Sequence, residues 1–136
     1  MLQQVSFFTG GGVIGCSAQL QQQTINNQIH PVYGLNSPFK ESGFYNYDAC
    51  ETNGTVAPVE GIYFMSMNLI LDSPSPTQTK RVTFYFREKL NPSHRFCVAA
   101  EDIYGERQTL TMACFARLEL HTELEIIVEN AFSLTI

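Results

Sequence analysis

The sequence predicts a single all-β domain, an antiparallel sandwich of the jelly-roll or immunoglobulin-like kind. The chain has 136 residues, close to the usual size of one domain. Only 15% of the residues are charged, while 10 are Phe and 6 are Tyr, a balance typical of sheets and not of helical bundles or disordered chains. Short apolar runs follow one another and are separated by turn residues. We therefore expect residues 1–136 to form one domain.

The composition also excludes two classes of partner. A net charge of −5 and a pI near 5.0 give no attraction for phosphate backbones, so nucleic acid is not an expected partner. The longest apolar run, from Gly61 to Leu71, is interrupted by Ser66 and Asn68 and is shorter than a membrane-spanning helix of about 20 residues. We expect no membrane insertion. The first residues also lack the pattern of a secretory signal.

The N-terminal region alternates between a strand, a reversal and a loop. Val5 to Phe8 is a short strand candidate, and the glycines at 10–12 permit a sharp reversal after it. A phosphate-binding loop is not expected, because no Gly-Lys-Ser/Thr follows. Residues 19–28 hold five glutamines and two asparagines, which predicts an exposed loop that stays out of the core.

After Pro31 the pattern predicts a series of short strands, each bounded by turn residues. In chain order they are Val32–Tyr33, Phe44–Tyr47, Thr55–Ala57, Ile62–Leu71, Lys80–Phe86, Arg95–Ala100, Thr109–Leu120 and Leu124–Asn130, with Ala131–Ile136 closing the chain. Val82, Phe84 and Phe86 alternate with polar residues, which is typical of a half-buried strand.

The longest strand has two different faces. Its apolar face holds Tyr63, Met65, Met67, Leu69 and Leu71, and its mixed face holds Ile62, Phe64, Ser66, Asn68 and Ile70. A mixed face that still carries an aromatic ring predicts a wetter contact, such as a partner subunit. The alternative is that Phe64 is a second core residue beneath a loop.

Residues 57–64 predict a corner that leads into this strand. Pro58 fixes φ and ends the preceding strand, and Gly61 lets the chain enter the next one without a side-chain clash. Tyr63 brings a large ring and a hydroxyl able to reach a buried acceptor. We expect these three residues to have structural roles and no chemistry.

The same segment and one downstream resemble the C1q globular-head family. Ala57 to Phe64 keeps the family's Ala-Pro, two residues and Gly-x-Tyr. Leu110–Leu118 followed by Leu124–Val128 looks like its leucine-rich strand, turn and valine-rich strand. Together the two blocks cover roughly residues 44–130. The resemblance implies a jelly roll shared with tumour necrosis factor ligands, secretion to the extracellular space, and assembly into a compact homotrimer.

Trimers in that family form about the sheet that carries the Gly-x-Tyr strand. The resemblance therefore implies that Phe64, Ser66 and Asn68 point toward the three-fold axis. It implies a non-catalytic recognition head of the innate-immunity type, which binds a glycan, a microbial surface or a cell-surface receptor. The alternatives are a signalling ligand similar to tumour necrosis factor, and a structural trimeric head such as a viral, phage-fibre or spore-coat jelly roll.

The four cysteines have no C-x-x-C spacing and the three histidines are scattered, so no zinc site is expected. Cys97 and Cys114 lie on neighbouring strand candidates. Because the resembled family often links two cysteines in comparable places, this pair is the expected disulfide, provided that the Cα atoms lie within about 7 Å. Cys16 with Cys50 is a second candidate pair. The alternative is four buried free thiols.

No catalytic motif is visible, neither G-x-S-x-G nor H-E-x-x-H, and we do not expect an enzyme. Glu123, Glu125 and Glu129 share one strand face by spacing. Such an acidic stripe predicts either a solvated face or a calcium site, since carboxylates are calcium ligands. Members of the resembled family bind calcium, which makes calcium the candidate cofactor.

Two surface features point to sugars. Asn53-Gly54-Thr55 matches the N-x-T acceptor for glycosylation, although Asn-Gly is also a favoured hairpin turn. Basic residues gather between positions 80 and 107, where they could meet anionic sugars, or serve only as scattered surface charge. The candidate ligand residues are Arg81, Arg87, His94 and Arg95.

Overall fold

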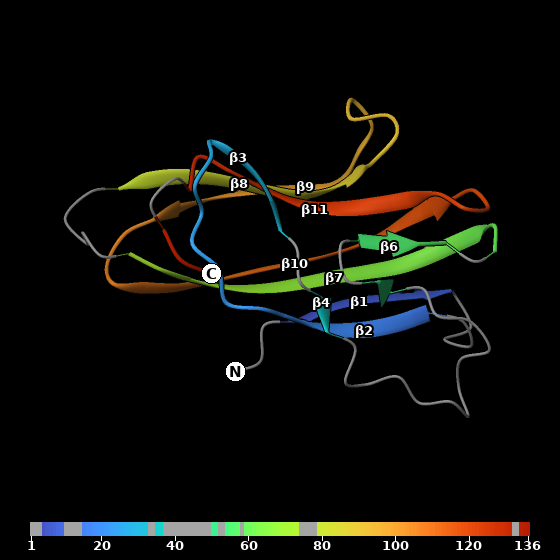
Figure 1. Ribbon diagram of the computed structural model, residues 1–136, viewed down its shortest axis with the longest axis horizontal. Coiled ribbons are helices and arrows are strands. Elements are labelled where there is room, and N and C mark those ends of the chain that lie inside the picture. The colour runs from blue at the N-terminus through green and yellow to red at the C-terminus, as the bar shows by residue number, and fades with distance from the viewer. Residues whose placement is uncertain are drawn as a thin grey trace.

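The computed structural model describes residues 4–9, 15–32, 35–36, 50–51, 54–57, 59–73, 79–131 and 134–136. Two antiparallel sheets lie one above the other with a buried apolar core between them (Figure 1). This arrangement resembles a β-sandwich and confirms the predicted all-β class. The described part of the chain contains no helix, and therefore none that is long and apolar enough to cross a membrane.

Sheet A is the lower layer in Figure 1. It is built from β1 (Gln4–Thr9), β2 (Gly15–Leu20), β4 (Leu35–Asn36), β7 (Gly61–Asp72) and β10 (Arg107–Leu118). These strands are ordered β10-β7-β1-β2-β4, so that β7 lies between β10 and β1.

Sheet B is the upper layer. It is built from β3 (Ile29–Val32), β5 (Cys50–Glu51), β6 (Gly54–Val56), β8 (Lys80–Glu88), β9 (Arg95–Ile103) and β11 (Glu123–Glu129). The main path runs β5-β6-β11-β8-β9, and β3 pairs with β11 as well. The C-terminal half of the chain thus supplies the long strands of sheet B and one edge strand of sheet A.

The two faces predicted for the longest strand are confirmed. Tyr63, Met65, Met67, Leu69 and Leu71 of β7 are all at most 1% exposed and belong to the core. In sheet B, Val82, Phe84 and Phe86 share the inner face of β8 and are completely buried as well. Apolar alternation on facing strands therefore accounts for the packing of the two sheets.

The amide-rich loop between β2 and β3 is the first correction, because we expected it to stay out of the core. Ile25 is completely buried, and its N–H donates to the carbonyl of Leu134 at 2.8 Å. Thr135 bridges both Thr24 and Asp72 at the end of β7. The loop and the C-terminal residues thus cover one end of the core together, and a single isoleucine among glutamines anchors them.

A β-bulge shapes the edge strand of sheet B. The register of β9 against β8 shifts between Phe84 and Phe86, so that Cys97 and Val98 both lie opposite Tyr85. Cys97 has a left-handed φ of 58°. The extra residue lets two neighbouring side chains of β9 turn toward the core, and Cys97 is one of them.

The predicted disulfide between Cys97 and Cys114 is confirmed. The two Cα atoms are 5.7 Å apart. Because Cys97 lies in β9 and Cys114 in β10, the bond joins the edge of sheet B to the edge of sheet A. It therefore closes one side of the sandwich covalently. The side chains of Cys16 and Cys50 lie outside the described residues.

Candidate functional site

The outer face of sheet A carries the residues predicted to form a subunit contact. Phe64, Ser66 and Asn68 are half-buried there and are not part of the core. Their register partners on β10 are Phe115, Ala113 and Thr111, all exposed. We call these six residues, with Ile62, the outer A face. It is continuous along two neighbouring strands and combines aromatic, small and uncharged polar side chains.

Two aromatic rings lie at the centre of the outer A face. The rings of Phe64 and Phe115 have their centroids 5.4 Å apart at an interplanar angle of 57°. Phe115 is 69% exposed and Ile62 is 55% exposed. Phe64 therefore packs against an exposed ring and is not among the described residues of the core. Sequence reasoning identified Phe64 but missed Phe115, although the alternation of β10 places Phe115 on this face.

The corner before β7 is built around Tyr63. Its ring is 1% exposed, and its hydroxyl donates to the carbonyl of Val59 at 2.7 Å, while burial raises the pKa of the phenol. The predicted role of Tyr63 is confirmed. The predicted need for glycine at Gly61 is wrong, because a Cβ there would meet no atom within 4 Å and φ is not left-handed. Pro58 and Asn53 lie outside the described residues.

Of the four candidate ligand residues, Arg87 lies opposite Arg95 across β8 and β9, and His94 precedes Arg95, whereas Arg81 lies near the start of β8. Each of the four lies beside an acid. Arg81 contacts Asp102 at 3.2 Å, Arg87 contacts Glu125 at 2.6 Å, His94 contacts Glu88 at 2.9 Å and Arg95 contacts Glu129 at 3.6 Å. The Arg87 pair is the most enclosed, with side chains 19% and 13% exposed. The outer face of sheet B thus neutralises much of its own charge.

Tyr85 is completely buried although it lies on this outer face of sheet B. Its hydroxyl donates to Oε1 of Glu129 at 2.5 Å, and the guanidinium of Arg95 lies 4.6 Å above the ring centroid. Burial, followed by the hydrogen bond and charge of Glu129, raises the pKa of Tyr85 to about 12. Sequence reasoning missed this network, since alternation alone assigns Tyr85 to a solvated face.

The acidic stripe of β11 is present, but two of its members are engaged. Glu125 accepts hydrogen bonds from Arg87, and Glu129 accepts one from Tyr85. Within the described ranges, no three His, Cys, Asp or Glu side chains come together in a way that could hold a metal ion. We therefore assign no residues to the calcium site that the sequence suggested.

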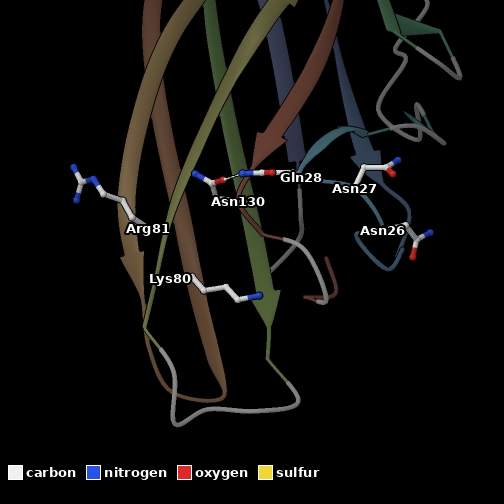
Figure 2. A pocket seen from close by; sticks show the side chains of 6 residues that line it. All are labelled: Asn26, Asn27, Gln28, Lys80, Arg81 and Asn130. Carbon is white, nitrogen blue, oxygen red and sulfur yellow. Dashed lines mark hydrogen bonds between the residues drawn. The ribbon is translucent and has the colours of Figure 1, made fainter.

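A pocket of about 670 Å³ opens at one end of the sandwich. Its described lining residues are Asn26, Asn27, Gln28, Lys80, Arg81 and Asn130. Figure 2 shows the side chain of Lys80 pointing into this space and that of Arg81 pointing away from it. We call this site the amide pocket, because four of the six side chains are carboxamides. Of these residues, sequence reasoning singled out Arg81 alone.

Hydrogen bonds fix one wall of the amide pocket. The side chain of Gln28 donates to Oδ1 of Asn130 at 3.0 Å, and the backbone N–H of Asn130 donates to the carbonyl of Gln28 at 2.8 Å. Asn130 has a left-handed φ of 64° directly after β11, which asparagine tolerates well. The two amides are thus held in place by segments that are 102 residues apart.

Comparisons with known proteins add no relative. A scan against models of protein families gave no match, and a search of curated proteins gave none either. The resemblance to the C1q globular head therefore rests on the motif residues around Tyr63 and along β10 and β11.

Proposed function

We propose that this chain is an extracellular, non-catalytic recognition head of the C1q-like jelly-roll type, which assembles as a homotrimer and binds a glycan, a microbial surface or a cell-surface receptor. The observation that carries the proposal is the outer A face. Phe115 and Ile62 expose their apolar side chains beside Phe64 on two adjacent strands. A flat, aromatic and uncharged surface of this kind is typical of the centre of a subunit interface.

The energetics of the outer A face favour self-association. Full burial of a phenylalanine side chain contributes about 1.5–3 kcal/mol, and Phe115 has 69% of its surface left to bury. Among the described residues, Arg117 lies opposite Ile62 at one end of this face, and its guanidinium pairs with Glu60. Burial of the uncharged centre therefore requires no unpaired charge to leave water.

Two further observations support the proposal. The disulfide between Cys97 and Cys114 is typical of an oxidising compartment, which agrees with an extracellular protein. Three copies around one axis would also present each surface site three times, and multivalent attachment turns weak single-site binding into strong overall binding. A recognition head with shallow sites depends on such a gain.

Light scattering coupled to size-exclusion chromatography at micromolar concentration tests the assembly. We expect a particle of three times the 15.3 kDa of one chain. Phe115→Glu should give monomers, because each copy would place a carboxylate in the buried centre. Leu90→Glu is the matched control, since Leu90 is 83% exposed on the β8–β9 hairpin of sheet B and should leave the trimer intact.

Two outcomes would overturn the assembly proposal: a monomeric wild-type chain, or a Phe115→Glu variant that remains trimeric. A glycan array screened with and without calcium then separates the recognition head from the other trimeric candidates. Binding to defined glycans supports recognition. Silence on the array, with the trimer intact, favours the signalling ligand or the structural head.

A further inference from the structure

We propose that Tyr104 is a site of tyrosine O-sulfation, at which a transferase moves a sulfuryl group from a phosphosulfate donor to the phenol oxygen. This inference rests on the proposed extracellular location, because such transferases act on chains that pass through the secretory pathway. It does not depend on assembly, since Tyr104 lies in the β9–β10 connection and not on the outer A face. Three properties of the segment support it: the exposure of the ring, its position in the fold and the charges around it.

The side chain of Tyr104 is open to solvent, unlike those of the other described tyrosines. Tyr104 is 67% exposed, whereas Tyr63 is 1% exposed and Tyr85 is completely buried. Among the described residues, none forms a hydrogen bond with the Tyr104 hydroxyl. Residues 104–107 are all exposed, so a second protein can also contact the backbone that follows the ring. The phenol oxygen is therefore accessible to the active site of another enzyme.

The fold presents Tyr104 on a corner between the two sheets. β9 ends at Ile103 and β10 begins at Arg107, so a short connection carries the chain from sheet B to sheet A. Gly105 turns the chain with a left-handed φ of 86°, which glycine adopts without strain. β9 and β10 are the last strands in the order of their sheets, so no described strand flanks the corner on its open side. A transferase can approach the ring from this side.

Carboxylates lie close to Tyr104 in the sequence. Glu101 and Asp102 precede it and Glu106 follows it, all within three positions. A transferase that holds an anionic phosphosulfate donor needs a cationic active site. Opposite charges on two surfaces speed their encounter and fix their orientation. The acidic segment therefore favours Tyr104 as a substrate of such an enzyme.

Two guanidinium groups lie near the corner, and each is already paired with an acid. Arg107 contacts Asp72 at 2.7 Å, and Arg81 contacts Asp102 at 3.2 Å. Among the described residues, no side chain pairs with the exposed carboxylate of Glu106. The arginines therefore do not make the corner basic, and Glu106 supplies a negative charge that a basic partner meets directly.

Sulfuryl transfer to Tyr104 is a substitution at sulfur. The phenol oxygen forms a bond to the donor sulfur, the bond from that sulfur to the bridging phosphate oxygen breaks, and a base of the transferase takes the phenol proton. The products are a tyrosine sulfate ester and a nucleotide phosphate. Sulfur keeps its oxidation state, so no oxidant or reductant takes part. The ester adds a negative charge with several acceptor oxygens, which arginine side chains of a binding partner recognise well.

Incubation of the full, disulfide-bonded chain with a tyrosylprotein sulfotransferase and phosphoadenylyl sulfate tests the inference. We expect mass spectrometry to show the gain of an SO₃ group, and electron-transfer fragmentation to place it on Tyr104. Glu106→Gln should lower the initial rate of this modification about threefold, because one attractive charge is lost. Glu119→Gln is the matched control, since Glu119 is also exposed but follows the other end of β10, and it should leave the rate unchanged.

Two results would overturn the inference: an unmodified Tyr104 under conditions in which the transferase modifies an acidic reference peptide, or equal rates for wild type and Glu106→Gln. Light scattering on the same sample separates this inference from the assembly proposal. A trimer in which Tyr104 stays unmodified overturns the sulfation site and leaves the assembly proposal standing. A monomer that is sulfated on Tyr104 supports the sulfation site and overturns the assembly proposal.

Discussion

The outer faces of sheet B and sheet A differ in how far their apolar side chains are covered and their charges are paired. On sheet B, Tyr85 and Ile127 are fully covered, and Arg87 and Glu125 neutralise each other. On sheet A, Phe115 remains 69% exposed. The centre of the first face is therefore covered within one chain, whereas the centre of the second leaves an aromatic ring mostly exposed. This difference is why we propose sheet A, and not sheet B, as the surface for assembly.

The register of the strands explains the difference. Across β8 and β11 of sheet B, Arg87 lies opposite Glu125, and Tyr85 lies opposite Ile127. Direct cross-strand partners of opposite charge, or of matching apolar shape, cover each other. Across β7 and β10 of sheet A, Phe64 lies opposite Phe115, but Ser66 and Ala113 beside them are too small to cover the two rings. In the described part of the chain, Phe115 therefore keeps 69% of its surface exposed.

The largest expected change in the free energy of unfolding separates two arginines, one on each sheet. Arg87→Met should lower the free energy of unfolding by about 3 kcal/mol, because Glu125, only 13% exposed, loses its partner. Arg117→Met should lower it by at most about 0.5 kcal/mol, because Arg117 and Glu60 are 68% and 54% exposed. Urea denaturation in the Phe115→Glu background measures both values without a contribution from assembly.

A double substitution distinguishes a lost partner from lost packing. Replacing Arg87 and Glu125 together by Met should restore most of the stability, because an apolar pair of similar volume can replace an enclosed ion pair. Equal losses for Arg87→Met and Arg117→Met would contradict the claim that the two faces differ.

A smaller change in the free energy of unfolding is expected at high pH, where the Tyr85 hydroxyl loses its proton. The unfolded chain releases this proton near the ordinary pKa of 10.0, and the folded chain releases it only at about 12. Between these values the folded state binds more protons, so stability falls as the pH rises. We expect wild type to lose about 2 kcal/mol more than Tyr85→Phe across this interval. Denaturant titrations at several pH values give the difference.

The comparison with Tyr85→Phe also removes the contribution of other groups. Tyr63 has a raised pKa too, but it titrates in both proteins and cancels. Parallel pH profiles for wild type and Tyr85→Phe would show that Glu129 and burial do not hold the proton on Tyr85.

The sequence predicted those features that depend on neighbouring residues in one strand. The alternation of β7 predicted its buried and its mixed face, and the resemblance to the C1q globular head indicated the pairing of Cys97 with Cys114 on neighbouring strand candidates. The burial of Ile25 could not be read from an amide-rich segment, because it depends on contact with Leu134, 109 positions further along the chain. Local pattern carries no information on such distant contacts.

The residues that line the amide pocket were even harder to predict from the sequence. It brings together residues around positions 26, 80 and 130, which no spacing rule connects. Arg81 attracted notice because of its charge, yet its neighbour Lys80 points into the pocket, since adjacent residues of a strand face opposite sides. Position on the strand, and not charge alone, decides which side chain enters the pocket.

The smallest expected effect on one folded chain is that of Phe115→Ser. Because Phe115 is 69% exposed and is not part of the described core, its replacement should change the free energy of unfolding by less than about 0.5 kcal/mol in dilute solution. At higher concentration the wild type should become more stable and the variant should not, because association stabilises only the folded state. A wild-type midpoint that stays constant with concentration would mean that the outer A face remains in water.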